Sequence, residues 1–376
     1  MTYQFDLCDS VEQIGKERWD ALFNSDFPFT SYEFFDALEK SGATSTNSGW
    51  QPLHLTMLKE GECIALVPLY IKHHPYGEYV FDWAWADAYH RHGVQYYPKL
   101  LTASPFSPVS GPKYGTQLPD ATFLPLLSQV IKELCHTYEW SSWHGLFLPE
   151  ASANQLEAQD MITRHGCQYH WFNQGYDSFE TFLDKFTSRK RKAIRKERKK
   201  VAEQDIRIQV HEGVEVDQTL IEHFYQCYQT THLQRGRQGY LNIDFFQHIF
   251  KTMPEKIVLF TAYQAGRAIA AALCFKDHTS LYGRYWGALG TYDCLHFETC
   301  YYTGIEYCIK HGLSHFDPGA QGEHKIQRGF EPIRTFSSHF IQHEGFEKAI
   351  QQFATEERDA IASQIDSLTE WLPFKN

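Results

Sequence analysis

The chain has 376 residues, of which 43% are hydrophobic and 16% aromatic, and its formal net charge is −11. This composition excludes an intrinsically disordered chain, and the length predicts two or three domains. No window approaches the ~18 uninterrupted apolar residues of a membrane span. The N-terminus MTYQFDLCDSVEQ lacks the basic and apolar regions of a signal peptide. We therefore expect a cytoplasmic protein with no transmembrane segment.

The cysteines and histidines show no pattern of a metal site or a disulfide framework. The nine cysteines are odd in number and contain no CxxC pair, which is typical of reduced thiols packed as small hydrophobic side chains. Pairs such as His73/His74 and His90/His92 lack the i, i+4 spacing and the glutamate of an HExxH site. We expect no metal ion and no permanently bound cofactor.

Two helix starts and a hairpin of the first half recur in the same order in the second half. They lie at Val11-Glu12, Tyr32–Phe35 and 55–72 in the first half, and at Val214-Glu215, Ile243–Phe246 and 258–276 in the second half. Both hairpin segments read strand, tight turn, strand, with Gly61 and Gly266 at the turns. The shared order predicts a duplicated unit.

The second hairpin is followed by a β-rich aromatic segment, a helix capped by Asp293 and ended by Gly312, and the short strand SHFD. Helices on mostly antiparallel strands, with one late helix crossing over to a strand, predict an α/β (α+β layered) fold with mixed, largely antiparallel sheets. We predict an N-terminal domain at 1–165, a connecting segment at 166–204 and a C-terminal domain at 205–376 that carries the active site.

A run of positive charge lies in the connecting segment of this acidic protein. Residues 185–200 contain ten Lys or Arg and one acid, Glu197, and the run has a helical apolar stripe. One interpretation is a solvated helix face that docks on acidic parts of the same protein. The other is a polyanion site for RNA, a nucleotide-linked carrier or a lipid-linked precursor, formed by Arg189, Lys190, Arg191, Lys192, Arg195 and Lys196.

A glycine-rich loop follows the last short strand and gathers ionisable side chains. The segment FDPGAQGEHKIQRG begins at Phe316 and holds one each of Asp, Glu, His, Lys and Arg. Loops at strand ends are where α/β folds place ligands, because glycine lets backbone N–H groups turn toward an anion. An ordinary Pro-Gly turn is the alternative. Two neighbouring groups add aromatic and polar side chains, and they are Arg284, Tyr285 and Trp286 on a strand and His296 and Glu298 at a helix start.

Three segments resemble the FemAB-like branch of the acyltransferase superfamily, a peptidoglycan biosynthesis/recognition or N-acyltransferase family. They are HWFNQGYDSFETFLDKFTSRKRKAIRKERKKV, YGRYWGALGTYDCLHFETCYYTGIEYCIKHGL and FDPGAQGEHKIQRGFEP. The resemblance implies a bacterial protein with tandem GNAT-like domains. It also implies transfer of an acyl or aminoacyl group, from aminoacyl-tRNA or acyl-CoA, to an amine, possible acceptors including a cell-wall peptide precursor. The Q/R-x-x-G-x-G/A loop of acyl-CoA enzymes has no convincing copy, which weakens acyl-CoA as the donor.

For such a transfer we expect Asp317, Glu323 or His324 to move the amine proton, and backbone amides near Gly319 and Gly322 to stabilise the oxyanion. The expected substrate-binding residues are Arg284, Tyr285, Trp286, His296, Glu298, Gly319, Gln321, Gly322, Lys325 and Arg328. Lys325 with Arg328 would bind donor phosphate. The rival hypotheses are a non-catalytic module that recognises a cell-wall precursor or an RNA, and a general RNA-binding protein.

Overall fold

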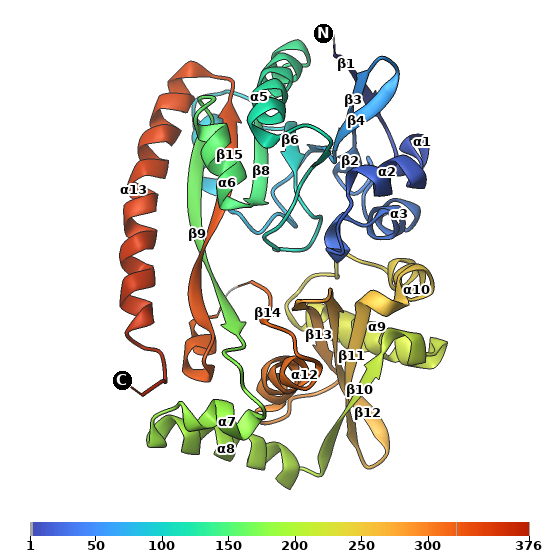
Figure 1. Ribbon diagram of the computed structural model, residues 1–376, viewed down its shortest axis with the longest axis vertical. Coiled ribbons are helices and arrows are strands. Elements are labelled where there is room, and N and C mark those ends of the chain that lie inside the picture. Colours follow the sequence, from blue (N-terminus) through green and yellow to red (C-terminus); the bar gives the residue numbers. More distant parts are fainter. Residues whose placement is uncertain (1–2, 321, 376) are drawn as a thin grey trace. The chain divides into compact units, whose positions relative to one another are not determined.

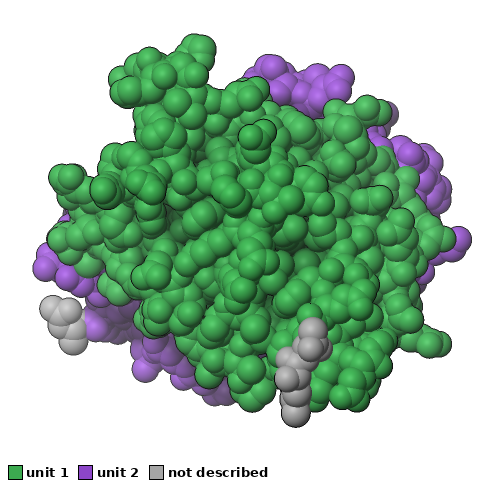
Figure 2. Space-filling view, turned by 90° about the horizontal axis from the view of Figure 1, so that it is seen from above, with its two compact units in different colours: residues 1–167, 334–364 green, residues 168–333, 365–376 purple. Residues whose placement is uncertain are grey.

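The computed structural model describes residues 3–320 and 322–375. The chain forms two compact units, coloured separately in Figure 2. Unit 1 comprises residues 1–167 and 334–364, and unit 2 comprises residues 168–333 and 365–376. These units are groups of residues in contact, whereas the domains 1–165 and 205–376 were drawn from the sequence repeat. The predicted domain boundaries therefore stay a prediction.

Unit 1 contains several short helices, an antiparallel hairpin and a pair of parallel strands. Its elements are β1 (Gln4–Cys8), α1 (Val11–Ile14), α2 (Lys16–Leu22), η1 (Pro28–Thr30), α3 (Tyr32–Lys40), β2 (Trp50–Pro52), β3 (His54–Lys59), β4 (Glu62–Val67), β5 (Tyr70–Lys72), α4 (Trp83–Arg91), β6 (Lys99–Thr102), β7 (Gly115–Thr116), α5 (Asp120–Thr137), β8 (Ser142–Leu148) and α6 (Glu150–Glu157). Strands β9 (Ile162–Phe172) and β15 (Glu331–Ile341) and helix α13 (Glu344–Thr369) contribute residues to both units.

Unit 2 repeats this plan after the basic segment (Figure 1). Its elements are α7 (Phe179–Asp184), α8 (Ser188–Glu203), β10 (Ile206–Glu212), η2 (Gly213–Glu215), α9 (Gln218–Gln234), α10 (Ile243–Thr252), η3 (Pro254–Lys256), β11 (Ile257–Gln264), β12 (Arg267–Lys276), β13 (Ser280–Ala288), α11 (Leu295–Phe297), the π-helical turn η4 (Glu298–Tyr302), α12 (Thr303–His311), β14 (His315–Asp317) and η5 (Glu323–Arg328). The predicted basic helix is α8.

Each unit holds mixed, mostly antiparallel strands, as predicted. In unit 1 the strands follow the orders β1-β3-β4-β7 and β15-β8-β6-β5-β2, and in unit 2 the order β10-β11-β12-β13-β14-β9. Strand β6 pairs in parallel with β8, and β13 pairs in parallel with β14. A helix lies between the strands of each pair in the chain, α5 in unit 1 and α12 in unit 2. The predicted α/β fold with mixed, largely antiparallel sheets is confirmed.

The duplication extends to the irregularities of the hairpins. At both turns the central residues have positive φ, Glu60-Gly61 in β3–β4 and Ala265-Gly266 in β11–β12, which fits the right-handed twist of the strands. The register shifts between Met57 and Leu58 in one hairpin and between Ala262 and Tyr263 in the other. β-Bulges are structural features that protein families keep. The same bulge at equivalent positions of both hairpins therefore supports a duplication. The repeat therefore describes two copies of one supersecondary unit.

Local signals explain the helix ends of unit 2. Asp217 and Asn242 cap α9 and α10, because their side chains accept backbone N–H groups of the first turn. Helix α12 ends at Gly312 with φ 69°, as predicted. The predicted cap at Asp293 is wrong, because Cys294 precedes α11 in a left-handed conformation and occupies the capping position. Among the helices of the described residues, none is long and apolar enough to cross a bilayer.

Candidate active site

Strands β13 and β14 part at the start of the glycine-rich loop. They run parallel over three residue pairs that end at Tyr282 and Asp317. Beyond Asp317 the chain leaves the sheet through Pro318-Gly319, whereas β13 continues to Ala288. Open α/β sheets bind ligands at the carboxyl ends of their strands, where neighbouring connections diverge. The structure thus brings the predicted loop and the predicted strand segment together at such a position.

A buried ion pair holds the loop to β13. Arg284 Nη2 lies 2.5 Å from Asp317 Oδ2, and both side chains are 1% exposed. The Gly319 N–H donates to Asp317 Oδ1 at 2.8 Å. Burial opposes ionisation, but Arg284 and these hydrogen bonds hold the pKa of Asp317 far below its usual value. A carboxylate held this way is a weak base, so its contacts favour an anchoring role over the predicted proton transfer, which stays a prediction.

Two histidines that sequence reasoning missed lie behind this ion pair. His170 Nε2 is 3.6 Å from Asp317 Oδ1, and His170 Nδ1 is 2.7 Å from His315 Nε2. Burial lowers the pKa of His170 to about 3, so its imidazole is neutral at pH 7. His170 comes from β9, far away in the sequence, and no local spacing connects it to the loop.

Lys325 places a buried ammonium group beneath the glycine-rich loop. The residue is 1% exposed, and Nζ donates to the carbonyl oxygens of Gly319 at 2.6 Å and Ala320 at 3.3 Å. Burial lowers the pKa of Lys325 to about 8, although the charge of Asp317 opposes this shift. The ammonium is therefore mostly protonated at pH 7, and it has three N–H donors. Two are directed to the loop, which leaves one for a further acceptor.

Aromatic rings from four elements gather near Lys325, whose Nζ lies 5.9 Å from the centroid of the Tyr301 ring. Trp286 of β13 lies 5.5 Å from His296, and His296 lies 5.2 Å from Tyr301, measured between ring centroids. Tyr301 OH is 3.0 Å from His324 Nε2. Burial lowers the pKa of His296 to about 4, so it is neutral. The structure thus brings the predicted residues Trp286, His296 and His324 together, and it adds Tyr301, which the sequence offered no reason to select.

Two other predicted substrate residues fasten the basic helix to the site. Arg328 Nη2 lies 2.8 Å from Glu197 Oε1, and Glu298 Oε1 lies 2.8 Å from Arg198 Nη2. Tyr302 OH also donates to Glu197. Glu197 is the one acid in the basic run. This exception is a sequence signal that could have indicated its specific contact with Arg328. Arg328 and Glu298 thus have structural partners on α8, while their predicted substrate contacts stay predictions.

The remaining predicted residues have different environments. Tyr285 is buried and packs against Tyr228 and Phe246, with ring centroids 5.9 and 5.6 Å apart, as a core side chain. Glu323 is exposed at the start of η5. Gly319 and Gly322 have φ of 90° and 116°, conformations that favour glycine. Gln321 lies outside the described residues.

Helix α8 divides the predicted polyanion-binding residues into two groups. Arg191 and Arg195 form ion pairs with Asp184 at 2.9 Å and Glu180 at 2.5 Å, and Lys190 donates to Gln327. Arg189, Lys192 and Lys196 are exposed, and for them no ion pair occurs within residues 3–320 and 322–375. Their spacing of three and four places them on one helix face. We call these three residues the open stripe.

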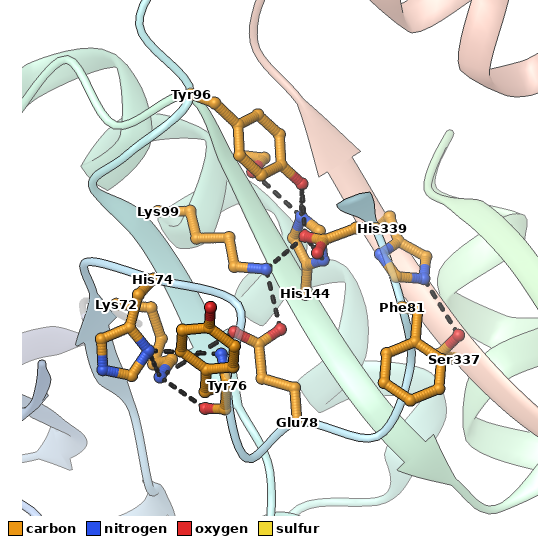
Figure 3. A network of polar contacts seen from close by, with 12 residues as sticks. Lys72, His74, Tyr76, Glu78, Phe81, Tyr96, Lys99, His144, Ser337 and His339 are labelled. Atoms are coloured by element: carbon orange, nitrogen blue, oxygen red, sulfur yellow. Dashed lines mark hydrogen bonds and ion pairs between the residues drawn. The ribbon is translucent and has the colours of Figure 1, made fainter. Parts of the chain in front are cut away.

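Unit 1 contains a separate network of buried charges, shown in Figure 3. Neighbouring strands each contribute one side chain, with Lys72 of β5 opposite Lys99 of β6, and His144 of β8 opposite His339 of β15. Segment 73–82 supplies the acids Glu78 and Asp82. Both lysine side chains are 0% exposed and both acids 1% exposed. Four buried ionisable groups, two basic and two acidic, are unusual, because isolated buried charges are costly.

The Lys99 ammonium contacts the two carboxylates that could otherwise bind a metal ion in this network. Glu78, Asp82 and His144 offer three ligand atoms within 4.8 Å of one another. Lys99 Nζ, however, contacts both carboxylates and lies 2.7 Å from Glu78 Oε2. Lys72 Nζ is 4.0 Å from Glu78 Oε1. A metal ion would face two ammonium groups, so the geometry favours an internal ion network.

Several solved structures resemble most of the chain in fold. The crystal structure of FemX matches with 12% identity and a TM-score of 0.55, covering 93% of this chain and 100% of that chain. The C-terminal domain (DUF2156) of a protein described as a lysylphosphatidylglycerol synthetase from Agrobacterium fabrum matches with 9% identity and a TM-score of 0.56, covering 90% and 95%. A protein of unknown function from Bacteroides thetaiotaomicron matches with 9% identity, a TM-score of 0.53 and coverage of 90% and 100%.

Sequence comparison is more specific about the family. None of the curated protein sequences matches the chain significantly. Residues 10–376 match the FemAB-like family, which is described as peptidoglycan biosynthesis/recognition. That match includes the parting strands, the glycine-rich loop and the basic helix. The chain therefore belongs to the FemAB-like family.

Proposed function

We propose that the protein is an N-acyltransferase that moves an acyl or aminoacyl group from an activated, phosphate-bearing carrier to an amine. The observation that carries this proposal is the buried Lys325 ammonium at the loop where β13 and β14 part. In direct aminolysis the amine nitrogen forms a bond to the carbonyl carbon, the C–O or C–S bond to the carrier breaks, and the amine loses a proton. The oxygen of the carbonyl carries negative charge in between, and a preorganised buried donor stabilises that charge.

The residues around Lys325 suit the parts of this reaction. The third N–H of Lys325 provides a donor for the oxyanion or for a donor phosphate. His324 and exposed Glu323 are the candidates to receive the amine proton, because Asp317 is occupied by Arg284 and Gly319. Burial and the charge of Arg328 lower the pKa of His324 below its usual value, so its imidazole is neutral and able to accept a proton. Trp286 and His296 would position the acceptor.

The donor proposed here is aminoacyl-tRNA, with acyl-CoA as the second candidate, and the acceptor is an amine of a cell-wall peptide precursor. The open stripe supports a polyanionic donor. Arg189 and Lys196 are seven residues apart, which is about 10 Å along a helix axis, comparable to about three phosphates of one nucleic-acid strand. Cations left without internal partners are available for phosphates, whereas those of Arg191 and Arg195 are already engaged.

Binding of total tRNA, measured by fluorescence anisotropy at several salt concentrations, tests the donor. In the variant Arg189→Glu/Lys192→Glu/Lys196→Glu, loss of three phosphate contacts should weaken binding and reduce the slope of log K against log salt by about 2 to 3. The matched control is Arg207→Glu/Lys251→Glu/Lys348→Glu, the same charge change at exposed positions outside α8. Equal losses in both variants would mean that the open stripe is not the binding site.

Transfer itself is tested with aminoacylated tRNA and a candidate amine, the product being detected by mass spectrometry. Preference for the aminoacylated pool with turnover supports a tRNA-dependent transferase. Tight binding without turnover supports the non-catalytic recognition module. Unchanged turnover in Lys325→Gln would contradict the role of the buried ammonium.

A further inference from the structure

A cavity of about 530 Å³ lies in unit 2 between α8, β10 and the start of α12. This volume falls within the range of about 300 to 1,000 Å³ typical of small-molecule pockets. One wall is aliphatic, because Ile206, Ile208 and Val210 alternate along β10 and so share one face of the strand. The other wall is polar and includes Arg198, Glu298 and Glu306. We call it the α8–β10 cavity.

The guanidinium of Arg198 forms a fixed plane in this cavity. Its nitrogens donate to Glu298 at 2.8 to 3.1 Å and to Glu306 at 2.6 and 3.1 Å. Phe179 supports it, with the guanidinium carbon 4.6 Å from the ring centroid. Five hydrogen bonds to two carboxylates prevent rotation of the group. An arginine held in this way offers a flat cationic surface, and nucleic-acid bases stack on such guanidinium planes.

The two carboxylates add hydrogen-bonding capacity at the edge of this plane. A carboxylate has about four lone-pair sites, so Glu298 and Glu306 retain acceptor sites after binding Arg198. Glu306 is 42% exposed on its side chain, and Glu298 is 10% exposed. Glu298 begins the π-helical turn η4, and such turns occur frequently at functional sites. Glutamate accepts hydrogen bonds from the exocyclic amine of a base.

The mouth of the cavity continues into the positive face of α8. Lys199 lines the cavity with a side chain that is 74% exposed, and its Nζ lies 3.3 Å from Oε1 of the exposed Glu203. It follows Lys192 and Lys196 at helical spacing, so the open stripe leads to the cavity. Neighbouring residues of α8 also reach the candidate active site, because Glu197 binds Arg328 next to Arg198. A phosphate chain along the stripe would therefore end at a site for a base.

We infer that the α8–β10 cavity binds a phosphorylated nucleoside whose base bears an exocyclic amine, with the base between the β10 wall and the Arg198 plane. This inference rests on the proposed function, since it places the nucleotide end of the donor. Adenosine fits this description, and it is present both at the 3′ end of a tRNA and in coenzyme A. The shared chemistry is an adenine nucleotide, and the experiment separates its two sources.

Calorimetric titration of the full chain with adenosine 5′-monophosphate tests the cavity directly. Ala202 lines it from an exposed position of α8, so Ala202→Trp should fill the space and weaken binding at least tenfold. Ala193→Trp is the matched control, because Ala193 is an exposed alanine of the same helix that does not line the cavity. Control binding should equal that of the unchanged protein.

Two further titrants distinguish the sources of the nucleotide. Tighter binding of a short RNA ending in CCA than of coenzyme A, lost in Ala202→Trp, indicates an RNA end, and the reverse order indicates coenzyme A. Absence of adenosine monophosphate binding at low salt, or binding that Ala202→Trp leaves unchanged, would overturn the inference. These binding results do not depend on turnover, so a failed transfer assay with intact nucleotide binding would refute the proposed reaction and leave the cavity assignment standing.

Discussion

Replacing Lys99 by methionine should destabilise unit 1 strongly. The side chain is 0% exposed and neutralises Glu78 and Asp82, which are each 1% exposed. Methionine keeps much of the volume but removes the ammonium that contacts both buried carboxylates, and Lys72 Nζ lies 4.0 Å from Glu78. Removing one partner of a buried ion pair costs about 3 to 5 kcal/mol, because the remaining charge is uncompensated. We expect a loss of this size at pH 7.5.

Urea unfolding followed by far-UV circular dichroism measures this loss as a shift of the midpoint multiplied by the slope m. At pH 5 the loss of unfolding free energy should be smaller, since protonation can neutralise the buried carboxylates that the variant leaves without the Lys99 ammonium. Lys40→Met is the matched control, because Lys40 pairs with Asp36 at 2.9 Å but is 55% exposed, and such surface pairs contribute at most about 1 kcal/mol. A loss below about 1 kcal/mol for Lys99→Met at pH 7.5 would refute the reasoning.

Substitutions of Glu78, Lys325 and Gly287 test the charges and the packing further. Burial raises the pKa of Glu78 from 4.5 to about 7. The folded state therefore binds this proton more tightly than the unfolded state does. Ionisation of Glu78 should lower the free energy of unfolding by up to ~3.4 kcal/mol as the pH rises from about 4.5 to 7. Glu78→Gln should remove that dependence, which urea midpoints at pH 5 and 7.5 would show. The pKa of Lys325 is about 8, so turnover that needs its ammonium should fall as the pH rises through about 8, and Lys325→Arg should move this fall to higher pH. Lys325→Gln should reduce turnover by about 10² to 10³. Gly287→Ala would place Cβ 2.0 Å from the Cys227 carbonyl oxygen and should prevent folding of unit 2, whereas Gly290→Ala, 3.4 Å from the Tyr292 side chain, should express as a folded protein.

Patterns close together in the sequence predicted the elements reliably. The hairpin turns follow from glycine at positive φ and alternating apolar residues, both of which act over a few positions. The basic run predicts α8 because its apolar residues recur at helical spacing. The duplicated order of these elements predicted the tandem fold. Aromatic and ionisable residues around the loop 316–328 also marked the candidate site, since those side chains are close in the sequence.

The partners of those side chains could not be predicted, because each comes from a distant strand or helix. His170 reaches Asp317 only because β9 lies beside β14, and Glu197 reaches Arg328 only because α8 packs beside η5. The tertiary structure also decided which cations of α8 are engaged and which form the open stripe. The sequence by itself indicated two or three domains and a concentrated run of positive charge at 185–200. Burial and pairing, which depend on the packing of remote segments, decided which of those charges anchor the fold and which remain available to a ligand.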